Sequence, residues 1–162
     1  MSSVPKYKRK ESSFQVFETA KKLRKELTTY ILRDFAIDGK LSEMEYWILN
    51  DERTEIMHDV RNVCSCIEMA NSIYVTCQTE LEERRKYQDL AIGWCNRLKT
   101  ELNYICDNFS SKVNMKKYGI SSRMVDEEIG LLKGWRKSNK KIQNNLAKSK
   151  LEDSVNSMTD VE

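Results

Sequence analysis

Residues that interrupt helices are scarce in this sequence. The 162 residues include one proline and five glycines. Hairpins and tight turns depend on these residues, so their scarcity argues against all-β and βαβ architectures. No apolar run approaches the roughly 20 residues needed to cross a membrane. These absences favour a helical protein of one-domain length, without a membrane span and expected in the cytoplasm.

The usual residues of catalytic and metal sites are also sparse. Five cysteines are an odd number in a chain long enough to build its own core, which predicts free thiols in a reducing compartment. Cys64 and Cys66 diverge on a helix, and there is no C-x-x-C pair. His58, the only histidine, lies opposite an apolar stripe and is expected on the surface. Phosphate-binding glycine loops are missing. The sequence therefore predicts no catalytic residue, no metal site, no cofactor and no enzymatic activity.

Charge is distributed unevenly along the chain. The net charge is +5 in residues 1–36, −6 in 37–111, +8 in 112–150 and −4 in 151–162. A chain with two cationic segments can present a polyanion-binding face if the fold brings those segments together. The order of the helices decides whether this happens.

Apolar residues recur at intervals of three and four in four segments, as they do on one face of an amphipathic helix. The first stripe is Val16, Ala20, Leu23, Leu27, Tyr30 and Ile31. The second is Tyr46, Leu49, Arg53, Ile56, Val60, Val63, Ile67 and Ala70. The third is Leu81, Gln88, Ala91, Cys95, Leu98, Leu102 and Ile105. The fourth is Leu131, Leu132, Trp135, Ile142 and Leu146.

Each stripe follows residues that can cap a helix N-terminus. These residues are Ser12 or Ser13 for the first helix, Ser42 with Glu45 for the second, Thr79 with Glu82 for the third, and Ser121 or Ser122 for the fourth. Short connections make successive helices antiparallel neighbours, so we expect an all-α, up-down-up-down four-helix bundle. The expected organisation is a basic flexible arm over residues 1–11, the bundle over 12–148 and an acidic flexible tail over 149–162.

The first and fourth helices are neighbours in this topology, which predicts a shared basic surface. At about 100° per residue, six lysines point away from the apolar stripes. They are Lys22, Lys25, Lys133, Lys137, Lys140 and Lys141. The excess of basic residues over 112–150 favours binding of a polyanion over simple solvation.

Three stretches resemble a known family. They are KYKRKESSFQVFETAKKLRKEL at the start, ANSIYVTCQTELEERRKYQDLAIGWCNRL in the middle and EEIGLLKGWRKSNKK near the end. They are similar to the accessory variability determinants, four-helix-bundle proteins that accompany reverse transcriptases in diversity-generating retroelements. That family is related to bundle proteins encoded in ribosomal RNA intervening sequences. The resemblance covers roughly residues 6–145.

The resemblance implies a non-catalytic accessory role. Such proteins form homopentameric rings, bind nucleic acid through a cationic surface and associate with the reverse transcriptase, which performs mutagenic cDNA synthesis from a template RNA. The implied partners are thus a reverse transcriptase, RNA and possibly DNA, and further copies of the chain. The matching residues would form the nucleic-acid-binding set, namely Lys21, Lys22, Arg24, Lys25, Lys133, Arg136, Lys137, Lys140 and Lys141.

A protein–protein adaptor or structural homo-oligomer with no nucleic-acid role is the alternative. Its basic face would then meet an acidic partner or the acidic surface of the next subunit. A metal or thiol enzyme is a third hypothesis, and it would require bound metal or a reactive cysteine.

Overall fold

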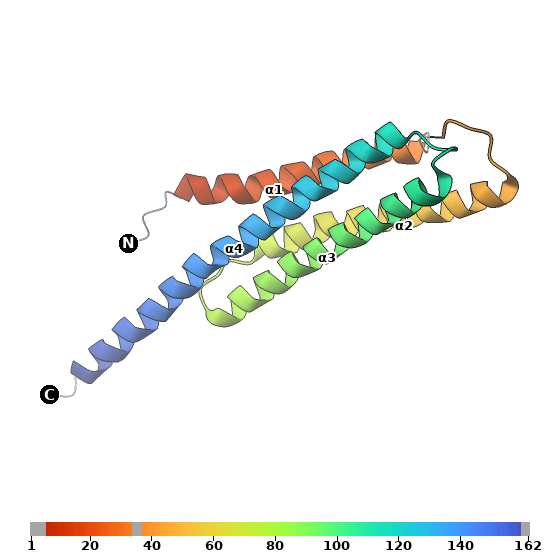
Figure 1. The fold of residues 1–162 in the computed structure, drawn as a ribbon. Coiled ribbons are helices and arrows are strands. Elements are labelled where there is room, and N and C mark those ends of the chain that lie inside the picture. Colours follow the sequence, from red (N-terminus) through yellow and green to blue (C-terminus); the bar gives the residue numbers. More distant parts are fainter. Residues whose placement is uncertain (1–5, 34–36, 160–162) are drawn as a thin grey trace.

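The computed structural model describes residues 6–33 and 37–159, with side chains over 15–33 and 37–149. This part of the chain forms α1 (Lys6–Glu26), a six-residue π-helix η1 (Leu27–Leu32), α2 (Glu43–Ser72), α3 (Gln78–Phe109) and α4 (Met115–Thr159). Figure 1 shows these helices running side by side, with each antiparallel to the next. The predicted all-α four-helix bundle is therefore confirmed.

The helices pack in a closed cycle. The backbone of α1 lies close to α2 and α4, and that of α3 lies close to α2 and α4, whereas the backbones of the diagonal pairs stay further apart in the described residues. The connections at one end also touch, because the Asp38 backbone N–H donates to the Lys112 carbonyl at 2.9 Å. α1 and α4 are thus neighbours, as the sequence predicts. The α1–α2 edge of the cycle lies opposite the α3–α4 edge.

The predicted apolar stripes form most of the core, because one face of each helix turns inward. All seven residues of the third stripe are buried, and Leu132 and Trp135 of the fourth are buried with them. Two predicted positions are wrong. Tyr30 and Tyr46 are exposed, at 44% and 59%.

The π-helix η1 explains the misplacement of Tyr30. A π-helix has a wider turn than an α-helix, so a stripe calculated at 100° per residue loses phase across it. Leu27, Ile31 and Leu32 are buried as a result, and Tyr30 turns outward. The Thr28 hydroxyl donates to the Arg24 carbonyl at 2.7 Å at the start of this segment.

A capping box begins α2, as predicted. The Glu45 backbone N–H donates to the Ser42 hydroxyl oxygen at 3.2 Å, and the Ser42 N–H donates to the Glu45 carboxylate at 2.6 Å. Two backbone donors that the helix leaves unpaired are thereby satisfied.

The predicted starts of α3 and α4 are wrong. Glu80, rather than Glu82, accepts from the N–H groups of Thr76 and Cys77, so Cys77 caps α3 and the helix begins at Gln78. α4 begins at Met115, where the Asn114 side chain accepts from the Lys117 N–H at 3.2 Å.

Substitution of the two candidate serine and threonine caps tests these assignments. We expect Ser42→Ala to lower the free energy of unfolding by about 1 kcal/mol, because the first turn of α2 loses its side-chain acceptor. Thr79→Ala should change it by less than about 0.5 kcal/mol, since Thr79 lies inside α3 and is exposed. Urea denaturation of both variants measures the difference. Equal losses would contradict the assignment of Cys77 as the cap of α3.

The helices also extend beyond the expected bundle limits. Residues 6–11 belong to α1, although the sequence predicts a flexible arm over 1–11. Residues 149–159 belong to α4, although a flexible tail is predicted over 149–162. In residues 6–11, lysine, arginine and glutamate predominate, and these residues favour helix even where no apolar face is present. The remaining residues of both segments, 1–5 and 160–162, lie outside the described part.

Glu128 lies in the core beside two cysteines. Its side chain is fully buried, and both carboxyl oxygens lack a hydrogen-bond partner among the described residues. Burial, with a smaller contribution from the charge of Glu127, raises its pKa to about 8. The pKa values of Cys64 and Cys95 are also raised, first by burial and then in part by Glu128. An ionisable group without a hydrogen bond in an apolar core is energetically costly.

Candidate nucleic-acid interface

All nine residues of the predicted nucleic-acid-binding set are exposed. Four lie on α1 and five on α4, outside the buried stripes of those helices. Their exposure follows from helix geometry, because positions such as 133 and 137 lie on the side of α4 away from Leu132 and Trp135. The structure then divides the set between two grooves.

The first groove lies between α3 and α4 and has a volume of about 490 Å³. Basic side chains dominate its lining, with Asp89 as the one carboxylate and Ile92 as the one apolar residue. The basic residues are Arg85, Lys133, Arg136, Lys137 and Lys140. We call this surface the α3–α4 groove. Four residues of the predicted set are thus brought together, and α3 adds Arg85, which the sequence did not single out.

Arg136 and Asp89 form an ion pair across this groove. The Arg136 Nη2 donates to Asp89 Oδ2 at 3.0 Å, and its Nε contacts Oδ1, so the pairing is bidentate. Lys133, Lys137 and Lys140 have no carboxylate partner among the described side chains. Three ammonium groups therefore remain available to an external anion.

Buried contacts between α3 and α4 hold the α3–α4 groove in place. The Asn139 side-chain amide donates to the Gln88 side-chain oxygen at 2.6 Å, and both residues are fully buried. Trp135 is 4% exposed, with the Arg84 guanidinium 5.3 Å from its ring centroid. Such contacts fix the rotation of α4 relative to α3, and with it the direction of the groove lysines.

The second groove lies between α1 and α2 and has a volume of about 480 Å³. Lys21, Arg24 and Lys25 line it, together with a single carboxylate, Glu68. The Lys21 ammonium lies 4.0 Å from the Phe17 ring centroid. We call this surface the α1–α2 groove.

The basic residues of α1 and α4 were expected to form one surface, but they line two separate grooves. They occupy opposite edges of the four-helix cycle, so the α1 and α4 clusters face in opposite directions. Lys22 and Lys141 are exposed but line neither groove. Adjacency of two helices does not fix how far each is rotated about its axis, and that rotation decides where the lysines point.

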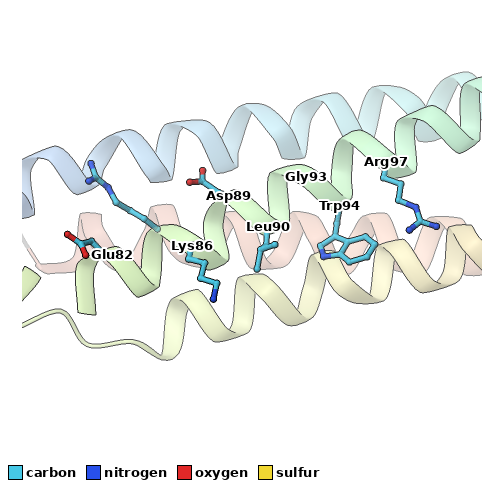
Figure 2. A pocket seen from close by; sticks show the side chains of 8 residues that line it. Glu82, Lys86, Asp89, Leu90, Gly93, Trp94 and Arg97 are labelled. Atoms are coloured by element: carbon cyan, nitrogen blue, oxygen red, sulfur yellow. The ribbon is translucent and has the colours of Figure 1, made fainter. Parts of the chain in front are cut away.

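A third and larger depression, of about 730 Å³, runs along α3. Figure 2 shows Lys86, Leu90 and Trp94 following one another along this helix, with Gly93 between the last two. Its charged lining is mixed, with Glu82 and Asp89 beside the basic residues. This mixture offers no preference for an anion.

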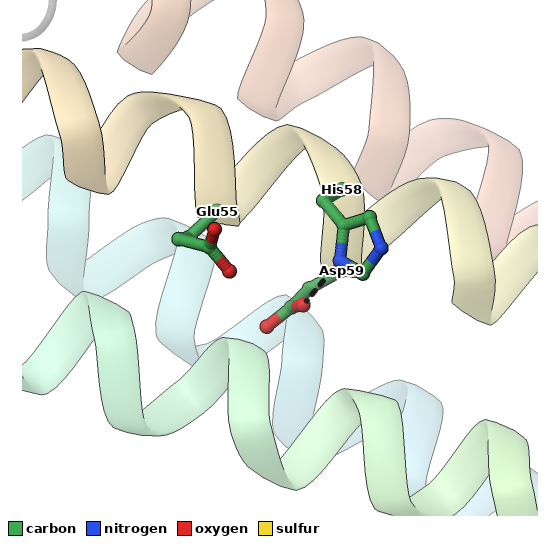
Figure 3. Close-up of side chains that lie close together, drawn as sticks. All are labelled: Glu55, His58 and Asp59. Carbon is green, nitrogen blue, oxygen red and sulfur yellow. Dashed lines mark hydrogen bonds and ion pairs between the residues drawn. The ribbon is translucent and has the colours of Figure 1, made fainter.

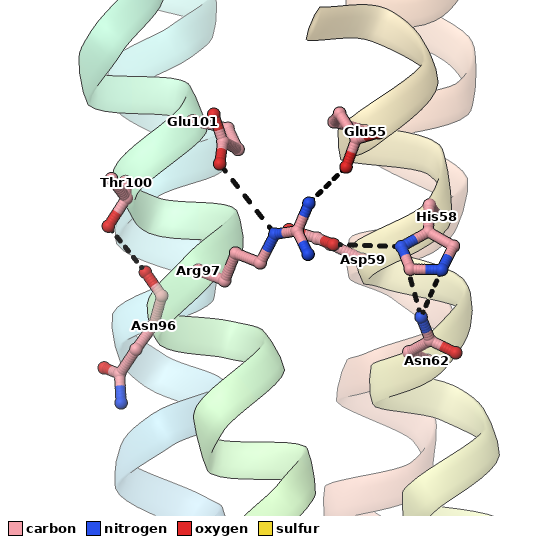
Figure 4. A network of polar contacts seen from close by, with 8 residues as sticks. All are labelled: Glu55, His58, Asp59, Asn62, Asn96, Arg97, Thr100 and Glu101. Carbon is pink, nitrogen blue, oxygen red and sulfur yellow. Dashed lines mark hydrogen bonds and ion pairs between the residues drawn. The ribbon is translucent and has the colours of Figure 1, made fainter.

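A polar cluster connects α2 and α3 on another face. The Arg97 guanidinium contacts the Glu55 carboxylate and lies 3.3 Å from Asp59 Oδ2 and 3.9 Å from Glu101 Oε1 (Figure 4). Burial raises the pKa of Asp59, against the opposing effects of His58 and Arg97. Burial and the neighbouring Glu101 raise the pKa of Glu52 to about 7.

Three of these residues form a potential metal-binding group that the sequence prediction missed. Ligand atoms of Glu55, His58 and Asp59 lie within 4.8 Å of one another (Figure 3). His58 is on the surface, as predicted, with its side chain 55% exposed. The spacing Glu55-x-x-His58 is the signal that could have revealed the group, because residues three and four apart share a helix face.

Large apolar side chains are exposed at the start of α2. Met44 is 66% exposed and Trp47 is 65% exposed, next to Tyr46. Three large apolar side chains are thus exposed within a stretch of four residues. Such a cluster is typical of a surface that contacts another molecule.

No family model, curated protein or solved structure matches this chain. Within the described residues, no helix combines the length and apolar character that a membrane crossing requires. The family resemblance thus rests on its three sequence stretches.

Proposed function

We propose that this chain is a non-catalytic nucleic-acid-binding protein that contacts phosphates through the α3–α4 groove. The observation that carries the proposal is the grouping of Lys133, Lys137 and Lys140, without carboxylate partners among the described side chains, around a groove that Arg85 also lines. Ammonium groups spaced along one groove match the repeated negative charges of a nucleic-acid backbone.

Binding of this kind depends strongly on salt and weakly on base sequence. A lysine that contacts a phosphate oxygen acts as a point charge, and such a contact carries no direct sequence information. Trp135, the aromatic residue nearest these lysines in sequence, is buried and so is not available for stacking on bases. Any choice among RNA sequences would come from a partner protein.

The proposed partner is a reverse transcriptase of a diversity-generating retroelement, as the resemblance implies. The chain would bind template RNA, with DNA as a second candidate ligand. It would do so as a homo-oligomer, a pentamer by resemblance, while the polymerase supplies the chemistry. Exposed lysines on a helical bundle suit this accessory role, since they can bind the RNA backbone without reacting with it.

A protein–protein adaptor or structural homo-oligomer remains the second candidate. The exposed Met44, Tyr46 and Trp47 favour it, because aromatic residues and methionine are enriched at protein interfaces. Their location on α2 lies away from both basic grooves, so this surface and nucleic-acid binding are compatible.

Charge reversal in the α3–α4 groove tests the proposal. We expect the triple variant Lys133→Glu, Lys137→Glu and Lys140→Glu to bind structured RNA at least about tenfold more weakly at 0.1 M salt than the wild type, because attraction to phosphate becomes repulsion. The slope of log affinity against log salt should become shallower by about one for each lysine that no longer binds a phosphate. Fluorescence anisotropy across a salt series gives both quantities.

A second triple variant provides the matched control. Lys40, Lys86 and Lys116 are exposed and lie outside both basic grooves, so changing them to glutamate alters the net charge equally. Binding should weaken less than in the groove variant, and light scattering should give the same mass for all three proteins. Equal losses would reject the groove as the binding surface. Dissociation of the groove variant alone would support the adaptor candidate.

A further inference from the structure

We propose that Glu55, His58 and Asp59 bind a divalent transition-metal ion, such as Zn²⁺, at the α2–α3 face, and that this ion displaces the Arg97 guanidinium. One imidazole and two carboxylates form a donor set typical of such ions. The proposal is independent of nucleic-acid binding.

Helix geometry brings the three donors together. Positions 55, 58 and 59 lie on one face of α2, and their ligand atoms converge within 4.8 Å (Figure 3). The His58 Nδ1 lies 3.3 Å from Asp59 Oδ1. Neighbouring ligands on a metal with bonds of about 2.1 Å are separated by roughly 3.0 to 3.4 Å, so this pair already has a suitable spacing.

Asp59 supplies the second observation. Its side chain is fully buried and aimed toward α3, and Oδ2 accepts no hydrogen bond among the described residues. The Arg97 Nε lies 3.3 Å away as an ion-pair contact without hydrogen-bond geometry. A buried carboxylate oxygen left in this state retains a lone pair for a cation.

The local charge also favours a cation of higher charge than the guanidinium. Glu55, Asp59 and Glu101 contact the Arg97 guanidinium, and Glu52 lies beside Glu101. Glu52 Oε2 also has no hydrogen-bond partner among the described residues. Arg97 supplies one positive charge to these carboxylates, and a divalent ion in its place would supply two.

Partial exposure leaves the Arg97 side chain room to turn toward solvent. Its side chain is 44% exposed, and its guanidinium lies 5.5 Å from the Trp94 ring centroid, which offers an alternative contact. His58 packs edge-on against the same ring at 5.3 Å. The aromatic ring thus orients the imidazole beside the two carboxylates.

The untagged protein with Cys77→Ser allows a direct test, since this change removes the exposed thiol that could also bind the metal. Titration with Zn²⁺ should shift the imidazole proton resonances of His58, the only histidine, to saturation at one ion per chain. His58→Gln should weaken binding in calorimetry by at least about tenfold. Arg97→Gln should strengthen binding severalfold, because it removes the competing cation.

Glu68→Gln is the matched control, because Glu68 is an exposed carboxylate on α2 outside the group. It should leave the Zn²⁺ affinity unchanged, and circular dichroism should show the same helix content in all variants. An imidazole spectrum that does not change at saturating Zn²⁺ would overturn the proposal. So would a His58→Gln variant that binds as tightly as its parent. Weaker binding by Arg97→Gln would show that Arg97 does not compete with the ion, and would reject the displacement.

Discussion

Replacing Glu128 with leucine is expected to raise the free energy of unfolding at pH 8 by about 3 to 5 kcal/mol. The wild-type carboxyl group is fully buried and has no hydrogen bond among the described residues, whereas leucine fills a similar volume without a polar group. Exchange of a buried ionisable group for a well-packed apolar one is commonly stabilising.

The sign of the pH dependence follows from the two pKa values of Glu128. Its pKa is about 8 in the folded protein and near 4.5 in the unfolded chain. Below pH 4.5 both states are protonated, and the contribution of Glu128 to stability is fully present. As the pH rises from 4.5 to 8, the unfolded chain releases the proton first, so wild-type stability falls. Above pH 8 both states are ionised and the loss is complete.

Urea unfolding at pH 5, 6.5 and 8 measures this effect. The gain in stability of Glu128→Leu over the wild type should increase with pH across the series. Glu127→Leu is the control, because substitution of this exposed neighbour should change stability by less than about 0.5 kcal/mol. A gain for Glu128→Leu that is the same at all three pH values would contradict the raised pKa.

Truncation of Trp135 to alanine is expected to lower the free energy of unfolding by about 3 to 5 kcal/mol. The indole is 4% exposed and packs under the Arg84 guanidinium, whose pKa is lowered by burial. Removing the ring leaves a cavity between α3 and α4 and also removes a neighbour of a half-buried cation. Thermal and urea unfolding provide the measurement.

Trp47→Ala is the comparison for this prediction. Trp47 is 65% exposed, so its loss should change stability by less than about 0.5 kcal/mol. Similar destabilisation by the two substitutions would contradict the assignment of Trp135 to the core. A loss of oligomer mass in Trp47→Ala alone would instead identify the start of α2 as a subunit contact.

The core was predictable from the sequence because apolar spacing is local information. Residues such as Leu98 and Ile67 repeat at three and four and are fully buried. Capping was predictable only at Ser42. Thr79 with Glu82 matches the sequence pattern of a capping box, whereas the pair used, Cys77 with Glu80, shares only its spacing, because cysteine stands where serine or threonine is usual.

The candidate site was predictable only in part. The exposure of Lys133 and Lys137 follows from the position of Leu132 and Trp135 on the same helix. Which residues of α3 face these lysines does not follow from the sequence. That depends on the rotation of α4, which contacts such as that between Gln88 and Asn139 determine. Arg85 belongs to the groove for the same reason. These contacts join residues about 50 positions apart and leave no mark on local periodicity.

The opposite directions of the α1–α2 and α3–α4 grooves have a consequence for assemblies. Two cationic surfaces that face away from each other cannot both lie flat against one straight polyanion, but they can each hold a separate strand. Under the proposed function, a bundle that bound a polyanion in each groove would be bivalent, and bivalent binders can link two chains. Such a protein would bring a second RNA segment alongside the one bound at α4.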